Sequence, residues 1–332
     1  MAKLIRRSIS SHRGKTGLVV AAILFLIATG AFGGDINKKA GTTGFSFLKL
    51  GVGARAVALG GAYTSMVGDP SVIHYNPAGT VHLRGRRFLA GYHNYFLDIQ
   101  SGFIAATKSL NESSTAGAFI SYMNYGEFTR TDVMGVIDEA DPTFSGGDFL
   151  LGLNYSRRLW PAFSAGMNLK FLVEYAAGYS AQVLAVDIGG LYTFADSLTR
   201  AGLAVYNLGA VLSGFSANSA NPHGDKLPWG LRAGLSHSLR ELPVIASLDA
   251  VIPNDNDFYL NAGLEMYKLR PLYLRLGYST FGENYKTGSD NDALGGLACG
   301  FGLDWKAFQF SYAFVPYLDL GASHRVTVVG EF

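Results

Sequence analysis

Seven histidines are the side chains of this sequence best suited to acid–base chemistry. A hydrolase would place one of them beside a nucleophilic serine, commonly in a G-x-S-x-G turn, and the sequence has no such turn. His74 comes two residues before Asn76 and is expected to make a packing contact rather than act as a base. We therefore predict that the protein is not an enzyme. The histidines are His12, His74, His82, His93, His223, His237 and His324.

Metal chemistry has little support in the sequence. The runs Asn254–Asp257 and Asp290–Asp292 carry oxygen ligands of the kind that hold calcium, but they lack the spaced carboxylates and closing glutamate of an EF-hand loop. The single cysteine, Cys299, excludes an intramolecular disulfide and any multi-cysteine metal site. We predict solvated loop tips, no metal and no cofactor.

Many of the other charges fall on one face of a regular alternation. In the stretch 164–175, Met167, Leu169 and Phe171 share one face, whereas Lys170 and Glu174 share the other. A β-strand turns successive side chains to opposite faces, and an oily face backed by charge is typical of a barrel that stands in lipid. The charges that we place inside such a barrel are Lys170, Glu174, Asp187, Arg232, Asp249, Glu265, Arg275 and Asp304.

The alternating segments that must position these charges number about fourteen. Their spans are approximately 86–94, 100–108, 115–124, 148–157, 163–175, 181–194, 199–208, 228–238, 243–251, 258–267, 271–279, 294–304, 306–315 and 323–332. Short turns alternate with longer connections, of which the longest are Gly126–Gly147, Gly209–Leu227 and Thr280–Ala293. Outer-membrane barrels combine short periplasmic turns with long outer loops. We predict an all-β transmembrane barrel over residues 86–332, with about fourteen antiparallel strands.

The first 33 residues read as a cleaved export signal. A basic stretch precedes the apolar run Leu18–Ala28, and small residues follow it. The alternative, a membrane anchor, needs about 20 apolar residues, which is longer than this run. Removal of residues 1–33 takes away five basic and no acidic side chains, so the formal charge falls from +2 to −3 and gives no argument for nucleic-acid binding. Charged residues make up 16% of the chain, against about 25% of a soluble domain. A wall that faces lipid would explain this low proportion of charge.

Residues 34–85 precede the first strand and have no place in the wall. Charges inside a barrel must pair, meet water or meet a plug, so we expect this segment to fill the lumen as a hatch. Its glycines, Gly51, Gly53, Gly60 and Gly61, permit tight turns and close approach to the wall. Asn76 directly before Pro77 is a plausible helix start. The sequence around Gly51 lacks the Gly-Lys-Ser/Thr of a phosphate-binding loop.

The same segment carries a family resemblance. The runs Phe47–Ala56, Leu59–Tyr63 and Tyr75–Gly79, together with Asp69, resemble the amino-terminal signature of the PorV/PorQ family. That family is part of the FadL-like group of outer-membrane barrels, and Asn76-Pro77-Ala78 resembles the NPA motif of the group. The candidate hatch residues are Gly51, Gly53, Arg55, Gly60, Gly61, Asn76, Pro77 and Ala78.

The resemblance implies an outer-membrane protein of type IX secretion, whose partners would be outer-membrane lipid, the carboxyl-terminal domains of secreted cargo and other secretion subunits. An even number of strands would return the carboxyl terminus to the periplasm, beside the amino terminus. Phe332, at the end of the last amphipathic strand, resembles the signal that the barrel-assembly machinery reads, so that machinery is a further expected partner. The alternative is a FadL-like transporter of hydrophobic small molecules, which needs an apolar pocket. Inward apolar residues such as Leu172, Tyr259 and Tyr273 are few in the strands, so the sequence favours the secretion role.

Overall fold

The structure is a computed structural model, and it describes residues 39–332 except 98, 138, 216–225, 241 and 268–270. The predicted export signal, residues 1–33, lies outside this part of the chain. All fourteen predicted strands lie within it.

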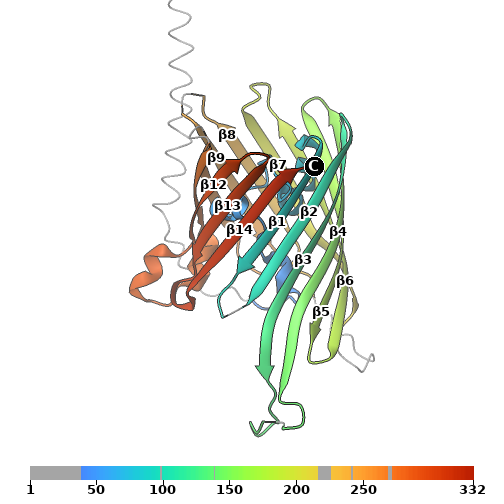
Figure 1. The fold of residues 1–332 in the computed structure, drawn as a ribbon, viewed down its shortest axis with the longest axis vertical. Helices are drawn as coiled ribbons and strands as arrows, with labels where there is room; N and C mark the ends of the chain where they lie inside the picture. Colours follow the sequence, from blue (N-terminus) through green and yellow to red (C-terminus); the bar gives the residue numbers. More distant parts are fainter. Residues whose placement is uncertain (1–38, 98, 138, 216–225, 241, 268–270) are drawn as a thin grey trace, which may run out of the picture.

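Fourteen strands form a closed antiparallel barrel, in which each strand pairs with its neighbours in the chain and β1 also pairs with β14 (Figure 1). The predicted fold class is therefore confirmed. The strands are β1 Arg86–Asn94, β2 Gln100–Asn111, β3 Ser114–Thr129, β4 Thr143–Trp160, β5 Phe163–Ala176, β6 Tyr179–Thr193, β7 Thr199–Ser213, β8 Gly230–Ser238, β9 Val244–Pro253, β10 Tyr259–Met266, β11 Leu272–Ser279, β12 Leu297–Trp305, β13 Phe308–Pro316 and β14 Ala322–Glu331.

The two faces of the wall follow the alternation of the sequence. On β5, Met167 and Leu169 are 50% and 43% exposed on the outside, whereas Lys170 is buried on the inside. Cys299 is exposed on the outer face of β12, where it lies opposite the exposed Leu276 of β11. Since a period-two pattern assigns each side chain to one face, the strand register leaves an apolar exterior and a polar interior.

The connections differ between the two ends of the barrel. At one end, which we call the short-turn end, residues 112–113, 161–162 and 306–307 join strands. At the other, the loop end, residues 130–142, 214–229 and 280–296 do so. The sorting by length has an exception, because β5 and β6 are joined at the loop end by residues 177–178 alone.

Two predicted loops are shorter than expected. β3 continues to Thr129 and β4 begins at Thr143, so both enter the predicted loop Gly126–Gly147; β7 likewise continues to Ser213. Pairing of β3 with β4 resumes after a register shift between Asn124 and Glu127, and the hairpin extends beyond the rest of the wall (Figure 1). The strands continue because the backbone hydrogen bonds between them need only a partner strand. The alternation of apolar and polar residues, which we used to predict the strands, arises only where one face of a strand lies in lipid.

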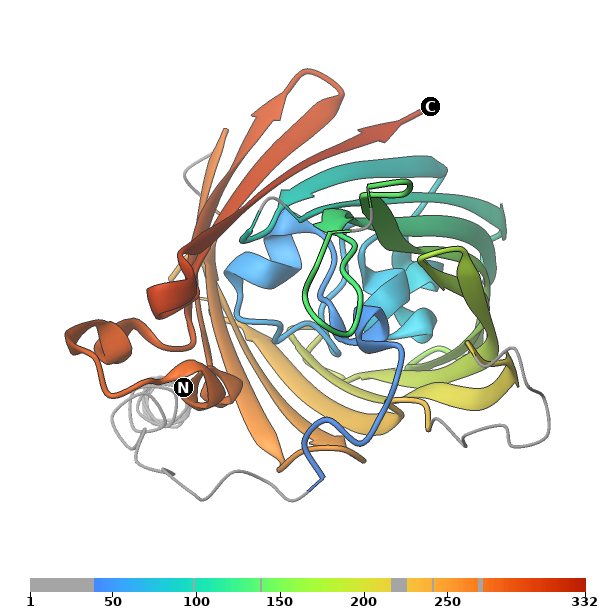
Figure 2. The same ribbon diagram turned by 90° about the horizontal axis from the view of Figure 1, so that it is seen from below.

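Residues 39–85, the N-terminal segment, run through the inside of the barrel (Figure 2). Its short helices are η1 Ser46–Lys49, α2 Ala54–Ala58, α3 Val72–Tyr75 and η2 Pro77–His82. Leu59, Tyr63 and Ile73 have no exposed surface, so the core of the molecule lies between this segment and the wall. That the segment acts as a hatch remains a prediction.

None of the helices in the described part of the chain has the length and apolar character needed to cross a membrane.

The described chain starts and finishes at opposite ends of the barrel. Thr43 and Lys49 both contact Asp255, in the loop-end connection between β9 and β10. β14, by contrast, ends beside the start of β1 at the short-turn end. We expected the amino and carboxyl termini to lie at the same end of the barrel. The amino terminus itself lies before residue 39 and outside the described part of the chain, but the first described residues are at the loop end.

Candidate functional site: the inner wall, the N-terminal segment and a loop-end cavity

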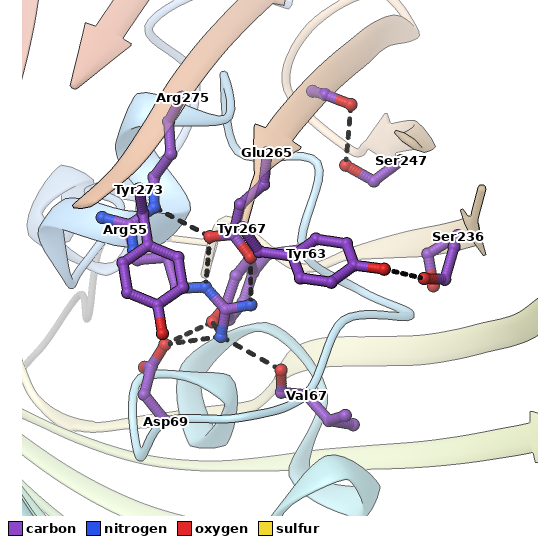
Figure 3. Close-up of polar contacts among 12 residues, drawn as sticks. Arg55, Tyr63, Val67, Asp69, Ser236, Ser247, Glu265, Tyr267, Tyr273 and Arg275 are labelled. Carbon is purple, nitrogen blue, oxygen red and sulfur yellow. Dashed lines mark hydrogen bonds and ion pairs between the residues drawn. The ribbon is translucent and has the colours of Figure 1, made fainter. Parts of the chain in front are cut away.

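A buried ion network fastens the N-terminal segment to β10 and β11 (Figure 3). Arg55 of α2 donates from Nε and Nη2 to the two carboxylate oxygens of Glu265, each at 2.7 Å, and Arg275 Nε donates to Glu265 at 2.8 Å. On its other side, Arg55 lies 3.2 Å from the Asp69 carboxylate and 3.0 Å from the Tyr63 hydroxyl. Two cations thus meet two carboxylates, and the paired fork geometry makes these hydrogen bonds strong.

The other predicted inner charges have separate partners. Lys170 pairs with Asp187 at 2.6 Å. Asp249 accepts hydrogen bonds from the backbone N–H groups of Tyr63 and Thr64, at 2.9 and 2.8 Å. These three charges therefore meet one another or the N-terminal segment.

Two of the predicted inner charges lie away from both groups. Asp304 accepts from the Tyr273 hydroxyl and the Gln309 amide rather than from a cation. Glu174 lies opposite Asp148 on the neighbouring strand β4. The inner charges therefore form separate local groups along the lumen.

Close approach of the N-terminal segment to the wall depends on glycine at Gly60. Its φ of +65° is a left-handed conformation, and a Cβ there would lie 2.7 Å from the backbone nitrogen of Tyr278 in β11. Gly53 and Gly61 also have positive φ, at +74° and +82°, whereas Gly51 does not. Positive φ thus occurs at three of the four glycines, whereas close approach to the wall occurs at Gly60 and Gly61; a Cβ at Gly53 would instead meet Ser71 of the same segment.

Asn76 joins three parts of the structure. Its side-chain oxygen accepts from the N–H of Ala78 at 3.1 Å, so it caps η2, in which Pro77 is the first residue. Its side-chain nitrogen donates to the carbonyls of Thr64 and Gly190, at 2.8 and 3.0 Å. The predicted helix start is confirmed, although the helix is 3-10 rather than α.

A cavity of about 460 Å³ lies at the loop end, between the N-terminal segment and the wall. Aromatic side chains make up much of its lining, and several come from connections rather than strands. The ten aromatic residues are Phe47, Tyr75, Tyr95, Phe96, Tyr125, Tyr206, Tyr259, Phe281, Tyr285 and Tyr317.

Five of these rings form a continuous chain along the cavity rim. Tyr95 contacts Tyr317, which contacts Tyr285, with ring centroids 5.2 and 5.1 Å apart. Phe281 then links Tyr285 to Tyr259, at 5.8 and 5.0 Å. Burial raises the pKa values of the loop residues Tyr95, Tyr285 and Tyr317, so their hydroxyls remain neutral at physiological pH.

Arg232 is the charged residue of β8 that borders this cavity. Its guanidinium lies 4.4 Å from the ring centroid of Tyr206 and 5.3 Å from that of Tyr75. Its Nη1 has no hydrogen-bond partner among the described residues, although Arg232 is only 8% exposed. The lining thus offers rings for an apolar molecule and one free donor for a polar atom of that molecule.

The stretch Phe47–Gly51 closes the inner side of the cavity. Phe47, Leu50 and Gly51 also border a second hollow of about 30 Å³, on the side of β1, β2 and β3. That volume holds about one water molecule. An apolar molecule in the first cavity therefore meets a closed partition.

The strand pattern of the sequence does not reveal this cavity. Tyr259, which the alternation places inside, does line the cavity, but Tyr95, Tyr285 and Tyr317 lie in connections, which a count of inward-facing strand residues leaves out. The conclusion that the interior has too few apolar residues for a pocket was wrong for this reason. The available signal was the abundance of tyrosine and phenylalanine at the ends of segments that converge on one barrel rim.

His82 should make stability depend on pH. Burial, followed by the charges of Arg200 and Arg158, lowers its pKa to about 4, from about 6.5 in the unfolded chain. Between these values only the unfolded state binds the proton, so stability is complete above the higher value and is lost as pH falls to the lower one. We expect the urea midpoint of His82→Gln to fall less than that of the wild type between pH 7 and pH 4. Equal slopes would contradict this assignment.

Comparisons with known proteins identify solved structures with a similar fold. Neither a protein-family model nor a curated protein matches the sequence. Among solved structures, the chain is similar to the toluene transporter TodX of Pseudomonas putida, with a TM-score of 0.57, 14% identity and coverage of 84% of this chain and 96% of that one. It is also similar to the monoaromatic hydrocarbon channel CymD, with a TM-score of 0.62, 11% identity and coverage of 85% and 98%.

A FadL homologue of Pseudomonas aeruginosa has a TM-score of 0.53 and 11% identity, with coverage of 85% of this chain and 98% of that one. At such identities the likeness concerns the fold. The closed fourteen-stranded barrel of this chain therefore shares its fold with these transporters and channels and with the FadL homologue.

Proposed function

We propose that this protein is an outer-membrane barrel that takes up small hydrophobic molecules through its loop-end cavity. The observation that carries the proposal is the aromatic lining of a 460 Å³ cavity, since ligand sites are typically apolar hollows of about 300–1,000 Å³ with a few polar groups. Aromatic or other compact apolar molecules suit the rings, and an acceptor atom on the molecule suits Arg232. The structural neighbours described as toluene or monoaromatic hydrocarbon channels support the same class of ligand.

Passage would need a further movement. The partition Phe47–Gly51 separates the cavity from the rest of the lumen, so a molecule bound there must wait for this stretch to shift. Phe47 and Leu48 of this stretch pack in the hydrophobic core, and Arg325 donates a hydrogen bond to the carbonyl of Gly51, so the movement must break these contacts. In this proposal the N-terminal segment acts as the hatch.

Uptake by whole cells tests the proposal. Ser46 is exposed and borders the cavity, so Ser46→Trp should fill part of it. In cells that lack the chromosomal copy, we expect wild-type protein to raise the initial uptake rate of radiolabelled toluene or oleate, and Ser46→Trp to lose most of that gain. Ser180→Trp, on the exposed outer face of β6, is the matched control and should behave as the wild type. Full uptake by the Ser46→Trp protein would show that transport does not depend on the cavity.

A role in type IX secretion is the second candidate. It needs a surface for cargo or partner subunits, and the loop between β3 and β4 exposes Val133, Met134, Val136 and Ile137. Large exposed apolar side chains in one loop favour a contact surface. We rank it second because the exposed apolar side chains of the tip line no hollow among the described residues, whereas the aromatic rings of the cavity do. Val133→Ser with Met134→Ser would reduce secretion under this candidate and leave uptake unchanged.

A further inference from the structure

The two ends of the barrel carry opposite charge. At the short-turn end, arginine and lysine outnumber aspartate and glutamate among the described residues, and Arg84, Arg86, Lys108 and Arg157 are exposed there. At the loop end, the described carboxylates outnumber the cations. Such a separation along the barrel axis means that the two membrane surfaces meet different electrostatic potentials.

Three of the cations at the short-turn end face outward, on β1, β2 and β4. Arg86 of β1 lies directly opposite Lys108 of β2. Arg157 of β4 faces the same way, since it continues the outward series of Leu153 and Tyr155, which are 55% and 46% exposed. Like charges placed directly opposite each other destabilise a sheet, so the pair Arg86 and Lys108 has an unfavourable interaction that the fold itself does not require.

Carboxylates of the chain do not neutralise these cations. Arg86, Lys108 and Arg157 form no ion pair with any residue in the described ranges. Of the described acidic residues at this end, Glu331 pairs with Arg87, Asp196 accepts hydrogen bonds from its own turn, and Asp304 accepts from Tyr273 and Gln309. Glu112, in the turn between β2 and β3, is exposed and forms no ion pair with the three cations. These cations are therefore available to an anion from outside the protein.

The three cations lie where the apolar wall ends. One step further along the outer face are Phe88, Ala106 and Tyr155, which belong to the lipid-facing side. Trp160 and Trp305, 63% and 56% exposed, flank the same rim. Exposed tryptophan and tyrosine mark the level of lipid headgroups in membrane proteins, and that level contains the phosphate groups.

We propose that Arg86 and Lys108, assisted by Arg157, bind the phosphate of an anionic phospholipid in the leaflet at the short-turn end. A guanidinium and an ammonium offer several N–H donors to one phosphate, and the lipid chains would lie along the apolar face of β1 and β2. The site holds the barrel at a fixed depth and distinguishes one leaflet from the other. It rests on the membrane placement proposed above and is independent of the loop-end cavity.

Native mass spectrometry of the full chain in non-ionic detergent tests this site. The probes are dioleoylphosphatidylglycerol and, with the same chains but no net charge, dioleoylphosphatidylcholine. The test variant is Arg86→Gln with Lys108→Gln. The control, Lys226→Gln with Lys286→Gln, removes the same charge at the loop end. The heat-dependent gel shift of each variant verifies that its barrel is folded.

We expect the wild type and the control to retain phosphatidylglycerol in preference to phosphatidylcholine. The test variant should lose about fivefold in phosphatidylglycerol affinity for each cation removed, or on the order of 30-fold in total. Sodium chloride should weaken phosphatidylglycerol binding to the wild type, because salt screens the attraction between the cations and the lipid phosphate. This measurement needs no variant. Equal affinity of the test variant and the wild type, equal retention of both lipids, or full displacement by inorganic phosphate would overturn the proposal. Uptake through the cavity should be unchanged in the test variant, so the two proposals fail separately.

Discussion

Glu265→Gln should lower the free energy of unfolding of the barrel by about 3–5 kcal/mol. The substitution leaves Arg55 and Arg275 facing each other in a site where Arg275 is only 4% exposed. Loss of one partner from a buried ion pair is costly, because the remaining charge keeps its desolvation penalty without its attraction. Equilibrium unfolding in urea measures the effect.

Two further variants make the interpretation specific. Glu331→Gln removes the partner of Arg87 in an exposed pair and should cost less than about 1 kcal/mol. Adding Arg275→Met to Glu265→Gln removes one of the stranded cations and should recover part of the loss. An effect of Glu265→Gln no larger than that of Glu331→Gln would show that the network does not anchor the N-terminal segment.

Asn76→Ala should cost on the order of 3 kcal/mol. It removes the cap of η2 and leaves the carbonyls of Thr64 and Gly190 without their side-chain donor, in a site with no exposed surface. Asn76→Asp keeps the oxygen and the shape but loses both donors, and it also buries a charge, so it should be no more stable than the alanine variant.

Asn111→Ala is the matched control for Asn76. The Asn111 side chain also accepts from a backbone N–H two residues ahead, that of Ser113 at 2.9 Å, but in an exposed turn. Its loss should cost less than about 1 kcal/mol. A similar small loss for Asn76→Ala would mean that the contacts of Asn76 with the wall add nothing to the cap.

The strands of the wall could be predicted from the sequence because the residue pattern of each strand depends on what its two faces contact. The alternation around Met167 and Lys170 contains both the strand period and the side that faces lipid. Its limit is visible at Thr129 and Ser213, where strands continue outside the region that imposes the alternation. The same period assigned Lys170, Asp249 and Glu265 to the interior, where the structure has them.

The partners of those residues could not be predicted in the same way. Arg55 and Glu265 are 210 positions apart, and no local pattern specifies that α2 lies against β10. The cavity depends even more on the tertiary structure, because Tyr95, Tyr285 and Tyr317 come together from three separate connections. A loop read alone resembles a solvated surface, and only closure of the barrel brings its rings over the lumen.

The central claim is that the loop-end cavity binds small hydrophobic molecules, and a crystal soaked with bromobenzene tests it most directly. The anomalous signal of bromine should appear in the cavity bounded by Tyr95, Tyr259 and Tyr317, and it should be absent from crystals of Ser46→Trp soaked in the same way. Bromine found only on the lipid-facing wall, with the cavity unoccupied in the wild type, would contradict the claim.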